Sequence, residues 1–236
     1  MGSSFSRRHF VGIAGAASWG LYRSFDRSGE VAAALRTSPS PDDILKDLLE
    51  GNQRFASGKV QAPRRGPKDF APLADGQLPE AVIIACADSR VPPEILFDQG
   101  VGDLFVIRVA GNIVGGAGAV VKGSIEYAVA ELGVKLIMVL GHTQCGAVKA
   151  AVKHLEDKDP LPGAIDEMVK LIQPAVERSK QKPGDAIENA IRENVLLGVE
   201  RLKGLEPILK APAAAGRLKV VGATYDLATG RVSVTT

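Results

Sequence analysis

The two cysteines of this chain each lie beside polar residues of the kinds that bind metals or move protons. Cys86 stands in "ACADSR", two residues before Asp88 and four before Arg90, and Cys145 follows His142 in "GHTQCG". No other cysteine occurs among the 236 residues. Two distant cysteines are compatible with a disulfide, a redox pair, a metal site or inert core thiols, and composition does not choose among these.

The spacing of His142 and Cys145 is typical of metal ligands, and Cys86 offers a third soft donor. Two thiolates and one imidazole suit zinc. Three protein ligands leave a fourth position for water, whose pKa zinc lowers to about 7. Asp88 is close enough in sequence to ligate the metal or to orient a bound hydroxide, and Arg90 can hold it ionised. A metal-free core or redox pair remains the alternative.

Composition and charge are those of an ordinary globular chain. Hydrophobic residues make up 45% and charged residues 24%, so a sizeable core can form. The formal net charge is +2, which predicts no broad basic surface for nucleic acid. The length fits one domain, or one domain with an extension.

Residues 1–34 have the pattern of an export signal, which leaves residues 35–236 as a single folded domain. Arg7 and Arg8 precede an apolar stretch that is too short for a standard membrane-spanning helix. The segment "SRRHFV" resembles the twin-arginine signal, and the alanines at 32–34 offer a cleavage site. We therefore expect export to a bacterial periplasm, with membrane contact only through an uncleaved leader. An uncleaved anchor, N-terminal myristoylation and a cytoplasmic chain are the alternatives.

Short apolar runs rich in Val and Ile predict the strands of the domain. "AVIIACA", "LFVIRVAG" and "KLIMVLGH" are typical of buried strands. "LKVVGATYDLATGRVSV" predicts a hairpin-like pair around Thr229 and Gly230. Strands that alternate with helices predict an α/β fold with a mostly parallel sheet core flanked by helices.

Helical patterns fill the segments between these strands. We expect helices over residues 117–132, 147–155, 164–179 and 185–203, with Pro174 bending or breaking one of them. An N-terminal helical arm is expected to start at a cap formed by Asp42 or Asp43, to be interrupted at Gly51 and to end at Gly58.

The strand order along the chain brings the two cysteine motifs together. Ligands of parallel sheets bind at the carboxyl ends of the strands. Cys86 and Asp88 lie at the end of the first strand, and His142 and Cys145 lie at the end of the third. The two motifs are therefore expected at one reactive edge.

"CADSR" followed by "GHTQCG" resembles the β-class carbonic anhydrases, whose signatures are C-x-D-x-R and H-x-x-C. The similarity covers residues 41–236 and includes "LLEGNQRFASG", "RVPPEILFDQGVGDLFVIRVAGN" and "GSIEYAVAELGV". The resemblance implies a zinc enzyme that interconverts carbon dioxide and bicarbonate through zinc-bound hydroxide. It also implies dimers, or multiples of dimers, with the active site at the dimer interface.

Residue by residue, the resemblance assigns roles to two sets of positions. The zinc ligands fall on Cys86, His142 and Cys145, and the catalytic dyad falls on Asp88 and Arg90. The substrate pocket of the plant-like branch falls on Gln77, Phe105, Tyr127 and Gly146. For Phe105 and Tyr127, simple core packing is an equal alternative.

The proton route departs from the pattern of the family. Glu131 stands where some plant enzymes have a histidine thought to relay protons. His154 could replace it only if its helix turned the ring inward, and a solvated surface histidine is the simpler interpretation.

Position 83 separates two branches of the family. In one branch the aspartate ligates zinc, and bicarbonate binds a regulatory pocket built on a tryptophan three residues before the first cysteine. Here that position is Ile83, and the only tryptophan is Trp19 in the leader. Together with Gln77, this predicts the plant-like branch, in which Asp88 holds Arg90 and the zinc site stays open.

Other activities stay open from the sequence. Look-alike enzymes hydrolyse carbonyl sulfide or carbon disulfide with the same ligands. A redox module is disfavoured because the cysteines lack C-x-x-C spacing. Nucleotide binding at "GNIVGGAGAVVKG" is disfavoured because the segment lacks G-x-G-x-x-G and a P-loop lysine, and its glycines are expected to pass close to the zinc pocket.

Overall fold

The apolar runs of the sequence form five strands of one sheet. In the computed structural model, which describes residues 39–116, 118–157 and 159–235, the strand order is β2-β1-β3-β4-β5. The strands are β1 (Ala81–Ala85), β2 (Leu104–Arg108), β3 (Leu136–His142), β4 (Lys219–Tyr225) and β5 (Val232–Thr235). The first four are parallel, and β5 pairs antiparallel with β4. The expected α/β fold with a mostly parallel sheet is confirmed.

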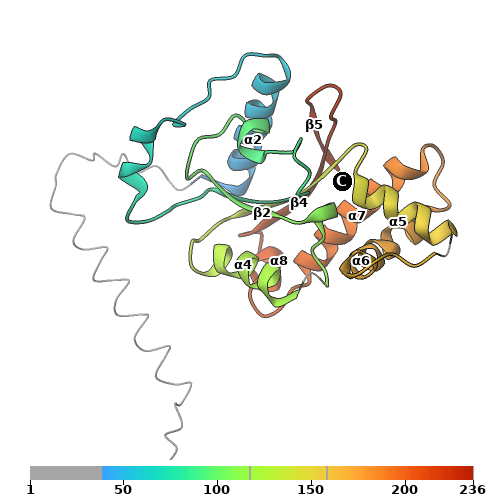
Figure 1. Ribbon diagram of the computed structural model, residues 1–236. Helices are drawn as coiled ribbons and strands as arrows, with labels where there is room; N and C mark the ends of the chain where they lie inside the picture. The colour runs from blue at the N-terminus through green and yellow to red at the C-terminus, as the bar shows by residue number, and fades with distance from the viewer. Residues whose placement is uncertain (1–38, 117, 158, 236) are drawn as a thin grey trace, which may run out of the picture. The chain divides into compact units, whose positions relative to one another are not determined.

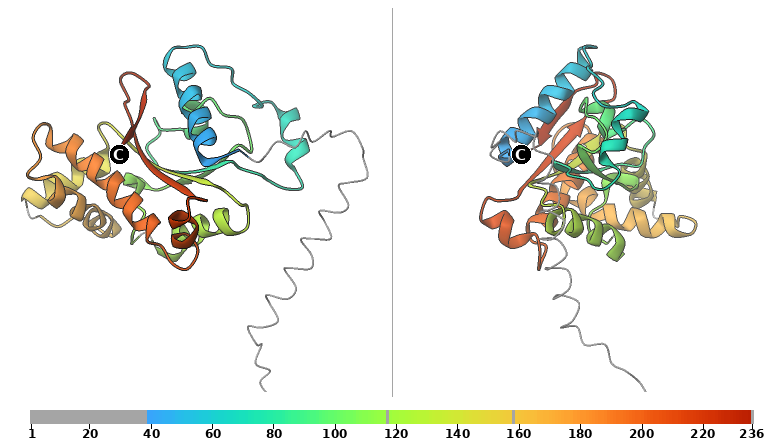
Figure 2. Two further views of the ribbon diagram at one scale, coloured as in Figure 1. Left: turned by 180° about the vertical axis from the view of Figure 1, so that it is seen from behind. Right: turned by 90° about the vertical axis from the view of Figure 1, so that its left-hand side faces the viewer.

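Both faces of the sheet are buried under helices, as the continuous apolar runs require. Side chains alternate between the faces, so Met138 packs under α2 (Pro41–Ala56) and α3 (Pro93–Leu96). Val139, its neighbour, packs under α4 (Gly118–Ala130) and α7 (Ala186–Lys203). Figures 1 and 2 show α2 on one side of the sheet and α4, α7 and α8 (Lys210–Ala214) on the other.

Besides the apolar clusters on the two faces of the sheet, a third apolar cluster lies beyond the strand ends and contains both cysteines. Helices α5 (Gly146–Asp157), α6 (Ala164–Ser179) and α7 pack together there, with Cys86 and Cys145 among the buried members. The cysteine motifs therefore lie where the sheet meets a three-helix layer. This places their polar atoms inside an apolar surround.

Three local expectations for the helices are corrected by the structure. Ser40, not an aspartate, caps α2: its hydroxyl accepts from the backbone N–H of Asp43, whose carboxylate accepts in return from the Ser40 N–H. Gly51 does not interrupt α2, because it lies buried within the helix against Phe97. Helix α6 also continues through Pro174, so of the expected bend or break the break does not occur.

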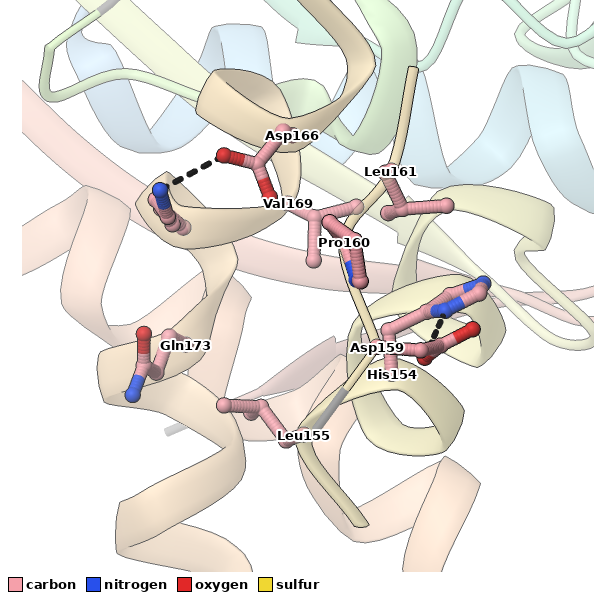
Figure 3. A pocket seen from close by; sticks show the side chains of 9 residues that line it. His154, Leu155, Asp159, Pro160, Leu161, Asp166, Val169 and Gln173 are labelled. Atoms are coloured by element: carbon pink, nitrogen blue, oxygen red, sulfur yellow. Dashed lines mark hydrogen bonds and ion pairs between the residues drawn. The ribbon is translucent and has the colours of Figure 1, made fainter. Parts of the chain in front are cut away.

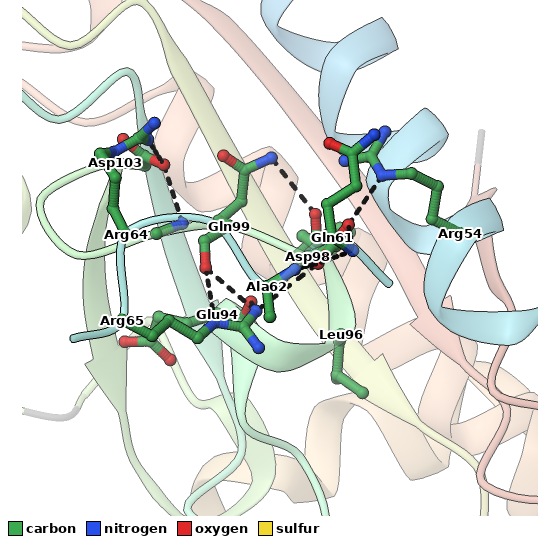
Figure 4. A network of polar contacts seen from close by, with 12 residues as sticks. Arg54, Gln61, Ala62, Arg64, Arg65, Glu94, Leu96, Asp98, Gln99 and Asp103 are labelled. Atoms are coloured by element: carbon green, nitrogen blue, oxygen red, sulfur yellow. Dashed lines mark hydrogen bonds and ion pairs between the residues drawn. The ribbon is translucent and has the colours of Figure 1, made fainter. Parts of the chain in front are cut away.

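A buried carboxylate fixes the loop that follows α2. Asp98 is fully buried and accepts hydrogen bonds from Arg54 Nε (2.7 Å), the Gln61 N–H (2.9 Å) and the Ala62 N–H (2.8 Å), as Figure 4 shows. Burial raises the pKa of Asp98, but these donors outweigh it and hold the pKa below its usual value. The network connects α2, the loop and the turn after α3.

The expected leader, residues 1–34, lies outside the residues that the structure describes. Within the described part of the chain, no helix combines the length and the hydrophobicity that crossing a bilayer requires.

Candidate metal centre

Strand register brings the two cysteine motifs to one point. β1 and β3 are adjacent and parallel, with Ala85 paired to Leu140, so Cys86 and His142 both lie just past this pair. The chain then turns through Thr143 and Gln144 and places Cys145 directly before α5. The sequence-based expectation of one shared edge matches this geometry.

Cys86, His142 and Cys145 form a cluster that can hold a metal ion. One ligand atom from each residue lies within 4.8 Å of the other two. The three residues are 4%, 0% and 1% exposed. Among the described residues, no other group of this kind is found.

The histidine ring supplies the test of whether a metal fits. His142 Nδ1 lies 2.9 Å from the Thr143 carbonyl, which only accepts hydrogen bonds, so Nδ1 carries the proton. This tautomer leaves the Nε2 lone pair free, and Nε2 is buried without a hydrogen-bond partner. A buried nitrogen lone pair is costly unless it accepts a hydrogen bond or binds a cation, and His142 Nε2 accepts no hydrogen bond from the described residues. The donor set therefore fits a soft divalent metal such as zinc.

The two thiols favour one deprotonated sulfur even before a metal is bound. A hydrogen bond from Cys145, aided by the backbone N–H groups of Asp88 and Gly111, lowers the pKa of Cys86 to about 4 against the effect of burial. The same hydrogen bond, together with burial, raises the pKa of Cys145. A dication would favour thiolate at both positions.

The turn between the ligands is fixed from two sides. The Thr143 N–H donates to Tyr225 O (2.9 Å), and its hydroxyl accepts from the Leu227 N–H (3.0 Å). Gln144 has a φ of +58°, an uncommon value for a residue with a side chain. The tight turn lets His142 and Cys145, three residues apart, face the same point.

Asp88 and Arg90 form a bidentate pair beside the cluster. Arg90 Nε donates to Asp88 Oδ1 (2.9 Å), and its terminal nitrogen donates to Oδ2 (2.7 Å). This pairing holds the pKa of the Asp88 carboxyl well below its usual range. Asp88 Oδ2 lies 3.9 Å from His142 Nε2, so the carboxylate borders the metal cluster.

Two residues that the sequence-based interpretation missed hold the segment around Cys86. Arg108 ends β2 and is paired with Ala85, so its side chain reaches the next turn and donates to the carbonyls of Cys86 (3.1 Å) and Asp88. Asn194 on α7 donates to Gly111 O (2.8 Å). Arg108 could have been predicted, because it is a charged residue at the end of an otherwise apolar strand. Nothing in the local sequence indicates a role for Asn194.

The expected pocket residues do not all surround the cluster within one chain. Gln77 is exposed in the loop before β1, and none of the hydrogen bonds among the described residues involves its side chain. Phe105 and Tyr127 contact each other, with ring centroids 6.4 Å apart, and Tyr127 is 48% exposed. Gly146 follows Cys145 and has open space around it.

The expected proton-relay positions lie at the surface. Glu131 is exposed. His154 pairs with Asp159 (2.6 Å) at a surface hollow between α5 and α6, and Figure 3 shows the two side chains facing each other. The alternative of a surface histidine agrees with this placement.

The glycine-rich segment contacts the cluster through Gly111. Gly111 donates its N–H to Cys86 Sγ (3.2 Å), as a loop close to the pocket would. Gly115 and Gly116 instead pack against Arg201 of α7 and Leu171 of α6. The expectation that this loop passes the zinc pocket is met at Gly111.

Comparison with known proteins identifies the family. The family model described as carbonic anhydrase matches residues 81–232. Carbonic anhydrase 2 of Mycobacterium tuberculosis is 42% identical over 192 residues, which cover 81% of this chain and 91% of the relative. The carbonic anhydrase of Mycolicibacterium smegmatis is 40% identical over 195 residues, covering 83% and 93%.

Solved structures give the same result for the fold. The β-carbonic anhydrase CcaA superposes with a TM-score of 0.62 at 33% identity, over 80% of this chain and 94% of that one. A tetrameric β-carbonic anhydrase of Sordaria macrospora gives 0.63 at 29% identity, over 81% and 96%. With the sheet, the Cys-His-Cys cluster and these matches together, the chain belongs to the carbonic anhydrase family, in its β class.

Proposed function

We infer that this chain catalyses the reversible hydration of carbon dioxide to bicarbonate and a proton at one zinc ion held by Cys86, His142 and Cys145. The observation that carries this function is the buried, unpartnered His142 Nε2 beside two thiols. When bound, zinc supplies a Lewis acid that brings the pKa of a coordinated water near neutrality. The remaining chemistry belongs to the side chains around it.

Asp88 and Arg90 have complementary tasks in this proposal. The Asp88 carboxylate stays ionised because Arg90 holds both of its oxygens. An ionised carboxylate beside the cluster can accept a hydrogen bond from the attacking water and so direct its lone pair toward the carbon of the substrate. Arg90 keeps the carboxylate at that position, while Arg108 holds the backbone on either side of Ala87.

The site belongs to the open branch in this proposal. Both Asp88 oxygens accept hydrogen bonds from Arg90, and this pairing favours a carboxylate that orients the water over one that ligates the metal. Ile83 is fully buried in β1 and offers no donor for a regulatory bicarbonate. We therefore expect no cooperative inhibition by bicarbonate.

A second copy of the chain completes the pocket in this proposal. Gln77 and Tyr127 are exposed in one chain, and Phe70 and Leu78, in the same loop as Gln77, are 54% and 86% exposed. Apolar side chains this exposed are typical of a surface that another chain covers. Gln77 of one chain would then donate its amide to a substrate oxygen at the cluster of the other.

Loss of one ligand tests the function. Cys145→Ser should lower zinc content from one per chain to near zero and abolish hydration, because three ligands leave no redundancy. The measurements are metal analysis and stopped-flow hydration of carbon dioxide, with hydrolysis of carbonyl sulfide assayed in parallel. Ser233→Ala is the control: it removes an exposed hydroxyl on β5, away from the cluster, and should leave zinc content and hydration unchanged. Full zinc and full activity in Cys145→Ser would refute the assignment.

Export remains a separate proposal, supported by "SRRHFV" and the following apolar stretch. The twin-arginine route carries folded proteins, so zinc could occupy the thiolates before an oxidising compartment is reached. Replacing Arg7 and Arg8 together by Lys should stop secretion, and unchanged secretion of this double variant would contradict the proposal.

A further inference from the structure

We propose that Asn194 is a positioning residue that sets the donor strength of the Cys86 sulfur by holding one backbone N–H against it. The proposal rests on the zinc-dependent function proposed above. It assigns a role to a side chain that touches neither the metal cluster nor the substrate pocket.

Two consecutive hydrogen bonds carry the connection from α7 to the cluster. Asn194 Nδ2 donates to Gly111 O at 2.8 Å, and the Gly111 N–H donates to Cys86 Sγ at 3.2 Å. Asn194 is 7% exposed, so its amide is shielded from water. The Gly111 carbonyl therefore accepts from Asn194 on α7, while the Gly111 N–H donates to Cys86 Sγ.

The turn at Gly111 depends on outside support. Gly111 has a φ of +72°, which glycine adopts at little cost but does not hold by itself. A Cβ here would lie 2.8 Å from Ile172 Cδ1 and 3.2 Å from Ala147 Cβ, so no larger residue can stiffen the turn. The bond from Asn194 anchors the following peptide and limits the rotation that would carry the N–H away from the sulfur.

The N–H···S hydrogen bond changes how strongly the Cys86 sulfur donates electrons to a metal. A hydrogen bond to a thiolate spreads its negative charge and weakens donation from its lone pairs. Such outer contacts typically alter metal affinity or activity by about 10–100-fold. The Gly111 N–H donates to Cys86 Sγ at 3.2 Å beside a second backbone donor, Asp88, so loss of the Gly111 contact should change the sulfur in part and be visible at Cys86.

Cobalt substitution gives a readout that does not depend on hydration activity. Asn194→Leu removes the donor at similar volume, and Asn194→Ser is a smaller second variant if the first folds poorly. In the cobalt-loaded protein, either change should move the thiolate-to-cobalt charge-transfer band to longer wavelength, because the sulfur becomes more electron-rich. Zinc affinity, measured by competition with a chelator, should still weaken by about 10-fold, because the lost ordering of the turn outweighs the stronger donation of the sulfur.

Asn52 provides the matched control. It is 3% exposed, and its amide bonds Leu96 O (3.1 Å) and Gly230 O (2.9 Å), in a part of the fold that contains none of the ligands. Asn52→Leu should lower thermal stability while leaving the cobalt band and the zinc affinity unchanged. An unchanged band and affinity in folded Asn194 variants, or an equal shift in Asn52→Leu, would overturn the proposal. Failure of the zinc function itself would show separately, as no thiolate band in the unsubstituted protein.

Discussion

In the proposed open site, the bidentate pairing of Asp88 with Arg90 leaves the fourth position on the metal to water. X-ray absorption on the zinc-loaded protein at neutral pH should show two sulfurs, one nitrogen and one oxygen that exchanges with solvent. The oxygen should survive in Asp88→Asn, because in the open-site proposal it belongs to water and the carboxylate stays paired with Arg90. A coordination shell that loses an oxygen in this variant, or steeply cooperative inhibition by bicarbonate, would refute the open site.

Single residues also show how far sequence reasoning extends. The cluster residues were predictable because apolar runs mark strands, and the ends of parallel strands meet at one edge. Arg108 and Asn194 were not, because their partners are set by the pairing of β2 with β1 and by the packing of α7, at sequence separations of 22 and 83 residues. No local pattern encodes such contacts.

At the scale of elements, the strands and main helices follow from periodicity, and the errors arise where packing overrides local preference. Gly51 illustrates this, because glycine normally weakens a helix. In the folded chain, a Cβ at position 51 would lie 1.8 Å from Phe97 O, so α2 tolerates only glycine at this crossing. The close approach of α2 to the end of α3 depends on it.

Gly51→Ala should therefore destabilise the protein by about 2 kcal/mol, despite the higher helix propensity of alanine. Urea unfolding of the purified chain measures this. Gly123→Ala in α4, where nothing lies within 4 Å of the added Cβ, is the matched control and should be neutral or stabilising by up to about 1 kcal/mol. If Gly51→Ala were as stable as the unsubstituted chain, α2 could move away from Phe97 at no cost, and the claim that this crossing requires glycine would be wrong.

At the scale of the whole molecule, the proposed sharing of the pocket predicts complementation between two defective chains. Gln77→Ala lacks the substrate donor, and Cys145→Ser lacks a zinc ligand. If Gln77 acts on the cluster of the partner, each mixed dimer has one intact site, and random exchange should restore about a quarter of the sites. Hydration assays after mixing and subunit exchange measure this. Activity that never exceeds the average of the two separate variants would place Gln77 in its own chain's site, or outside catalysis.

The near-complete burial of all three ligands has a kinetic consequence. An ion enclosed by side chains that are 4% exposed or less can leave only when the surrounding segments open, so its exchange is limited by protein motion. Release to a chelator should then proceed at a rate that does not depend on chelator concentration. Under the export proposal, the metal bound to the protein would then be determined by the metals available in the compartment where the chain folds.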